Sequence, residues 1–169
     1  SVFTNIPDPE PQYTEEEIAA ICAGGDPQDV NWQAHVVNCP DLSGYRLFAN
    51  ATDPTGATKT ARGLPYDLTT PLFSDYAKKY RYVYVPPQTT AEYHDSNSMD
   101  FPVGTMIAKT FGLPLANGTE QIVETRLLVR RESGWKSLPY IWDADMSDAR
   151  LALGGGAVNA DIIDPDGNY

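Results

Sequence analysis

The sequence predicts an α+β domain, mainly an antiparallel β-sheet with an N-terminal helix and a short C-terminal helix. Two observations predict this class. A helical pattern with clear end signals occurs near the N-terminus, before a loop rich in Thr, Gly, Pro and Asp. Beyond residue 79, successive segments alternate between two faces, as strands do. A length of 169 residues without internal repeats fits one globular unit.

The first predicted element is a helix that begins after Thr14. Glu17 stands three positions later, so the hydroxyl and the carboxylate can satisfy first-turn amides as a capping box. Ile21 and Cys22 share one helical face, and Gly24-Gly25 ends the helix.

The two cysteines, Cys22 and Cys39, are predicted to form a disulfide, with two buried free thiols as the alternative. Their spacing matches neither CxxC nor CxxCH, and no second pair could complete a zinc site. A disulfide indicates an oxidising compartment, periplasmic or extracellular. Closing a loop of this size stabilises a fold by about 3 kcal/mol. We interpret residues 1–41 as an N-terminal extension and residues 42–169 as the β-rich domain, together one globular unit.

Between the cysteines and the strands, Trp32–Cys39 is ambiguous, and Leu42–Phe48 predicts a short helical turn. Strands are predicted over Tyr80–Val85, Thr105–Phe111, Ile122–Arg131 and Trp135–Trp142. In the third strand, Val123 and Leu127 share one face and Arg126 lies on the other. Ser133-Gly134 predicts a hairpin turn into the fourth strand. Ala144–Leu153 predicts the short C-terminal helix.

Charge and hydropathy exclude two classes of partner. The net charge is −11 and the pI is about 4.4, the wrong sign for binding a nucleic-acid backbone or an anionic membrane surface. No run of about eighteen apolar residues occurs, so the sequence predicts no membrane span.

Several sequence blocks together resemble a known family. They are LSGYRLF at Leu42–Phe48, LPYDLTTPLFSDYAKKYRYVYVPP at Leu64–Pro87, DFPVGTMIAKTF at Asp100–Phe111, ETRLLVR at Glu124–Arg130 and GWKSLPYIWDAD at Gly134–Asp145. In this order they are similar to the N-terminal, haem-free region of exported bacterial diheme c-type cytochromes. The resemblance covers most of the chain from Leu42 onward and implies an electron-transfer context.

The chain departs from that family in one respect. Family members carry CxxCH haem-attachment motifs beyond this region, whereas this sequence contains none. The resemblance therefore implies no haem on any residue here, and implies haem only in a further C-terminal segment or none at all.

A weaker similarity links Pro102-Val103-Gly104, Lys109 and Gly134-Trp135 to the small β-sheet domain of cytochrome P460. In that family a lysine is joined to the haem, and the similarity would imply this role for Lys109. The haem-binding motif is missing, and a solvated lysine on a strand is the alternative.

A basic patch and a set of aromatic residues are the candidate docking site. Lys78, Lys79 and Arg81 form the one dense basic patch in the sequence, suited to an acidic partner or a haem propionate. The aromatic residues that could line a sheet face are Tyr76, Tyr80, Tyr82, Tyr84, Trp135, Tyr140 and Trp142. Their rings could stack on sugars or on a haem edge, and ordinary cross-strand packing is the alternative.

Catalytic signals are weak. His35 and His94 stand in unrelated contexts, and no GxSxG, HExxH or Walker motif occurs. Carboxylate pairs for glycoside hydrolysis could be drawn from Glu124, Asp143, Asp145 and Asp148, with surface charge and helix capping as the alternative.

A calcium-like pattern lies near the end of the sequence. Asp164, Asp166 and Asn168 surround Gly167, which can take the tight turn that brings hard oxygen ligands together. The closing Glu of an EF-hand is missing, and an acidic turn is the alternative.

The sequence thus predicts a non-haem accessory or docking domain of an exported c-type-cytochrome-like protein, without chemistry of its own. Its expected partner is a c-type cytochrome segment or redox partner. An extracellular ligand- or carbohydrate-binding module and a small hydrolase are the alternatives.

Overall fold

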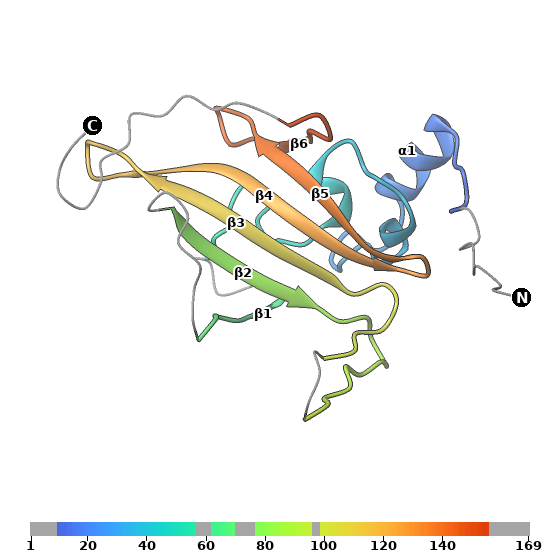
Figure 1. Ribbon diagram of the computed structural model, residues 1–169. Helices are drawn as coiled ribbons and strands as arrows, with labels where there is room; N and C mark the ends of the chain where they lie inside the picture. Colours follow the sequence, from blue (N-terminus) through green and yellow to red (C-terminus); the bar gives the residue numbers. More distant parts are fainter. Residues whose placement is uncertain (1–9, 57–61, 70–76, 96–98, 156–169) are drawn as a thin grey trace, which may run out of the picture.

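The computed structural model describes residues 10–56, 62–69, 77–95 and 99–155. Its centre is a six-stranded antiparallel sheet in the order β1-β2-β3-β4-β5-β6, so each strand pairs with its neighbours in the sequence (Figure 1). The strands are β1 (Leu64–Pro65), β2 (Lys78–Tyr84), β3 (Met106–Pro114), β4 (Glu120–Arg131), β5 (Gly134–Trp142) and β6 (Ala149–Leu151). The predicted antiparallel sheet and the hairpin turn into β5 are confirmed.

The predicted N-terminal helix is α1 (Glu15–Ala23), and its ends are those that the sequence indicates. The Thr14 hydroxyl accepts from the Glu17 amide at 3.2 Å, and the Glu17 carboxylate accepts from the Thr14 amide at 2.8 Å. Two 3-10 turns follow, η1 (Trp32–Val36) and η2 (Leu42–Tyr45). The turn η1 lies in the segment Trp32–Cys39, whose structure was ambiguous in the sequence. The turn η2 confirms the short helical turn predicted over Leu42–Phe48.

The disulfide between Cys22 and Cys39 is confirmed. It joins the last turn of α1 to the segment between η1 and η2. Gly44 packs directly against this bridge, because a Cβ atom there would lie 3.0 Å from Cys39 Sγ. The bridge therefore holds three parts of the N-terminal region together.

One face of the sheet is covered by residues 10–56, here called the covering layer, which Figure 1 shows behind the sheet. Tyr45 of the layer meets Tyr140 of β5 edge to face, with ring centroids 6.0 Å apart. The Tyr140 hydroxyl donates to the Cys39 carbonyl at 2.7 Å, and the Tyr45 hydroxyl donates to the Val37 carbonyl at 2.9 Å. These bonds satisfy polar groups that would be costly to bury alone.

A register shift between Phe111 and Gly112 changes which β4 residues face the core. Leu127 is fully buried, as its alternation predicts. On the other side of the shift, Gly112 pairs with Ile122, and Ile122 rather than Val123 packs against the core. The predicted face of Val123 is thus wrong, because a bulge adds one residue to the two-residue period.

The short helix predicted over Ala144–Leu153 is also wrong. The chain instead turns between Asp143 and Asp148 and returns as β6. The Leu151 amide donates to the Pro40 carbonyl at 2.9 Å, so β6 bonds to the covering layer as well as to β5. Pairing on both edges of β6 provides more backbone hydrogen bonds than a short isolated helix would. These tertiary contacts override the local preference of this segment for a helix.

Candidate docking surface

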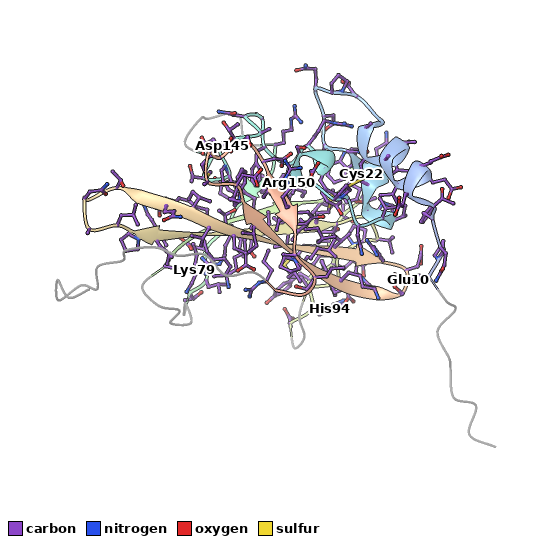
Figure 2. All side chains as sticks on the ribbon, turned by 90° about the horizontal axis from the view of Figure 1, so that it is seen from above. Glu10, Cys22, Lys79, His94, Asp145 and Arg150 are labelled. Carbon is purple, nitrogen blue, oxygen red and sulfur yellow. A yellow bond between two sulfur atoms is a disulfide. The ribbon has the colours of Figure 1, made fainter. Side chains whose placement is uncertain are left out.

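The second face of the sheet carries a row of positive charge. Arg81 of β2 pairs in register with Lys109 of β3, and Lys109 pairs with Arg126 of β4. Register partners project from the same face of an antiparallel sheet, so the three side chains stand side by side. We call Arg81, Lys109 and Arg126 the cationic row. Lys79 precedes Arg81 by two residues and shares its face, and Figure 2 places it opposite Cys22 across the sheet.

Carboxylates balance the row only in part. Arg81 is buried and pairs with Asp67 at 3.1 Å, although the Asp67 side chain is 92% exposed. Arg126 bonds Glu124 through two nitrogens, at 2.9 and 3.2 Å. Lys109 has no carboxylate within 4.0 Å among the residues that the structure describes. The two carboxylates, Asp67 and Glu124, stand against the three cations of the row and leave it one positive charge in excess.

Phe111 stabilises two cations of the row. Lys109 Nζ lies 4.8 Å from the centre of its ring, and Arg126 Cζ lies 5.2 Å away. Attraction to the ring helps to hold the two side chains close despite their repulsion. Burial lowers the pKa of Lys109, and the positive charges of Arg81, Lys79 and Arg126 lower it further.

Lys109 should therefore react with an amine-acylating reagent at lower pH than Lys78. The neutral amine is the nucleophile, and a hydrogen bond with Tyr80 raises the pKa of Lys78. We expect the acylation rate of Lys109 to reach half its maximum at the lower pH of the two, measured by peptide mass spectrometry across a pH series. Identical pH profiles would contradict the electrostatics of the cationic row.

Exposed apolar and aromatic side chains lie beside the row. Leu128 of β4 is 36% exposed and Trp135 of β5 is 43% exposed. The Trp135 ring meets Phe101 edge to face, with centroids 6.0 Å apart. Aromatic residues and arginines together are typical of the centres of protein–protein interfaces.

Most of the predicted aromatic set lies on the other face of the sheet. Tyr82, Tyr84, Tyr140 and Trp142 are buried beneath the covering layer, and Tyr80 is half-buried there and donates to Glu120. Of the set, Trp135 is exposed on the second face, and Tyr76 lies outside the described residues. The basic patch is divided too, since Lys78 alternates toward the side of Tyr80, away from Lys79 and Arg81.

The histidines lie in separate places. His35 Nδ1 contacts the Trp32 carbonyl at 2.7 Å, and exposed His94 contacts Asp100 at 3.0 Å. Within the described ranges, no hydrogen bond of either imidazole involves a serine hydroxyl. The two rings therefore do not share a site with each other.

The predicted acidic residues have structural partners. Asp143 accepts from Arg150, the Asp145 carboxylate from the Ser147 amide, and Asp148 from the Ser43 amide. Asp164, Asp166 and Asn168 lie outside the described residues. Among the residues that are described, no three His, Cys, Asp or Glu side chains are grouped so as to hold a metal ion.

Sequence reasoning missed the part of the site that β3 and β4 contribute. Alternation predicted that Arg126 faces away from Leu127, but it did not align Arg126 with Arg81. The available signal was one outward cation on each of three consecutive strands. It becomes a row only when the register of both hairpins is known.

Comparison with known proteins yields no significant match to a family model, to a curated protein or to a solved structure. Within the described residues, no helix combines the length and the apolar character needed to cross a membrane.

Proposed function

We propose that the chain is the non-haem docking domain of an exported c-type-cytochrome-like protein, and that the cationic row binds an acidic surface of the haem-bearing segment. The observation that carries this proposal is the gathering of Arg81, Lys109 and Arg126 on one sheet face of a chain with net charge −11. Lys109 and Arg126 are the side chains that a partner could contact, and buried Arg81 adds to the positive potential there. Complementary charge of this kind fixes orientation and favours the correct partner.

The surroundings of the row favour a protein partner over a small ligand. Leu128 and Trp135 extend the surface along β4 and β5, so charge and apolar area lie together on one sheet face. A surface of this composition suits an interface with an apolar centre and a polar rim. The buried position of Tyr82, Tyr84 and Tyr140 leaves those rings unavailable for stacking on a sugar.

The disulfide supports the proposed site of action. Cys22 and Cys39 are bonded to each other, and such bonds persist in oxidising compartments. A periplasmic or extracellular location agrees with an exported cytochrome. In this proposal the domain positions the redox segment and performs no chemistry itself.

The DNA that follows the codon for Tyr169 tests the cytochrome part of the proposal. We expect the reading frame to continue into CxxCH motifs, and the protein expressed from it to show the Soret band of bound haem. A reading frame that ends without such a motif, together with a colourless purified protein, would contradict it.

Lys109→Glu should weaken binding of the separately purified haem-bearing segment by about tenfold or more, because it reverses charge at the middle of the row. Lys78→Glu is the matched control, since it makes the same change in net charge at an exposed position of β2 outside the row. Titration calorimetry at low and high salt measures both effects. Equal weakening by the two variants would show that overall charge, and not this face, governs binding.

A further inference from the structure

A cavity of 280 Å³ opens in the covering layer, away from the cationic row. It lies beside η2, and its exposed apolar lining is Pro27, Ala49 and Ala51, whereas Leu42, Leu47 and Phe48 lie beneath it and are each at most 7% exposed. The other residues that line it are Ser43, Arg46 and Arg62. Two guanidinium groups therefore border a mostly apolar space.

The two arginines are adjacent and firmly held. Arg46 Nε and Arg62 Nη1 both donate to the Asp29 carbonyl oxygen, each at 3.2 Å. Arg62 Nη2 also donates to the Pro27 carbonyl at 3.2 Å, and Arg46 Nη2 donates to the Gly24 carbonyl. Sharing one acceptor brings two like charges close together, and the added bonds restrict their motion.

In the described part of the chain, neither guanidinium forms an ion pair with a carboxylate. Among the described residues, no Asp or Glu oxygen lies within 4.0 Å of either guanidinium, although the sequence holds 23 acidic and 12 basic residues. Carbonyl oxygens accept hydrogen bonds but carry no net charge. The pair is therefore a preformed site for an anion, since Arg suits carboxylate and phosphate geometry.

The backbone of Arg46 ends η2 beside the cavity. Arg46 has φ 49° and ψ 43°, the left-handed region, and its amide donates to the Ser43 carbonyl as the C-cap of η2. The cap fixes the direction in which the Arg46 side chain leaves the backbone next to the cavity.

We propose that this cavity binds a small organic monocarboxylate with an apolar body. The carboxylate would pair with Arg46 and Arg62, and the apolar body would lie against Pro27, Ala49 and Ala51. The volume is at the lower end of ligand sites, which limits the ligand to a few carbon atoms or one ring.

Benzoate is the probe, and NMR titration of the whole chain measures its binding. We expect a Kd of about 1 mM, with amide shifts centred on Ser43, Arg46 and Ala51. Benzyl alcohol tests the need for the carboxylate, and inorganic phosphate tests the need for the apolar body. Both should bind at least about tenfold more weakly than benzoate. Equal binding of either, or benzoate shifts centred elsewhere, would overturn the proposal.

Ala51→Glu should weaken benzoate binding by about tenfold, because it places a carboxylate at an exposed position in the lining of the cavity that both arginines border. Ala116→Glu is the matched control, at an exposed position in the turn between β3 and β4. Arg62→Gln should weaken binding similarly without adding negative charge. Unchanged affinity in both Ala51→Glu and Arg62→Gln, with folded spectra, would overturn the assignment of the site.

Discussion

Replacing Arg131 by alanine should lower the free energy of unfolding by about 2–4 kcal/mol, because it removes a charged donor that bonds three acceptors at the junction between sheet and covering layer. Arg131 is 8% exposed. Its Nε donates to the His35 carbonyl at 2.7 Å, and its Nη2 donates to the Val37 carbonyl at 2.8 Å and to Asn38 Oδ1 at 2.7 Å. Without it, the half-buried His35 carbonyl and Asn38 amide oxygen lose this donor, while the Val37 carbonyl keeps its bond from the Tyr45 hydroxyl.

The neighbouring arginine is the control. Arg130 is half-buried and its Nη1 donates to the Arg131 carbonyl at 3.1 Å. Arg130→Ala should therefore cost less than about 1 kcal/mol. Urea denaturation monitored by tryptophan fluorescence measures both variants. Arg131→Lys should recover part of the loss, because a lysine restores the charge but not the planar fork of donors. Equal free energies of unfolding for Arg131→Ala and Arg130→Ala would show that Arg131 does not stabilise the packing of the covering layer on the sheet.

The second large effect is expected from removing the disulfide. Cys22→Ser with Cys39→Ser should lower the free energy of unfolding by about 3 kcal/mol, since the reduced chain regains the freedom of a loop with sequence separation 17. Helix α1 contains no fully buried residue, so this bridge adds substantially to the attachment given by the Asn31 side-chain amide bonds to the Ile21 and Cys22 carbonyls. Far-ultraviolet circular dichroism should report loss of helix before the main unfolding transition.

A reducing agent provides the internal control for the disulfide. It should destabilise the natural chain to the level of the double serine variant and leave that variant unchanged. Reduction that leaves the unfolding midpoint of the natural chain in place would contradict the proposed attachment of α1.

Local signals account for the elements that the sequence predicted correctly. Thr14 and Glu17 mark the start of α1, and alternation marks β2 to β5, because capping and two-residue periodicity act between near neighbours. The segment Ala144–Leu153 was predicted wrongly because its partner, Pro40, is distant in the sequence. Its hydrogen bond to Leu151 cannot be inferred from either segment alone.

The difference between signals from near neighbours and contacts between distant segments also applies to the candidate docking surface. Alternation separates Tyr82 from Arg81, but it does not say which face the covering layer conceals. The sequence therefore predicted that the tyrosines could bind a ligand, but the structure buries them. Arg126 was not among the predicted site residues, yet it belongs to the cationic row. Which face is concealed depends on the packing of residues 10–56.

The cationic row also bears on how an encounter would proceed. Close to most of the surface, an acidic partner is repelled by a molecule of net charge −11. Attraction begins only within about one Debye length, roughly 8 Å at physiological salt, of Arg81, Lys109 and Arg126. Repulsion by the rest of the surface therefore shortens encounters in the wrong orientation. The encounters that last are those in which the partner already faces the cationic row.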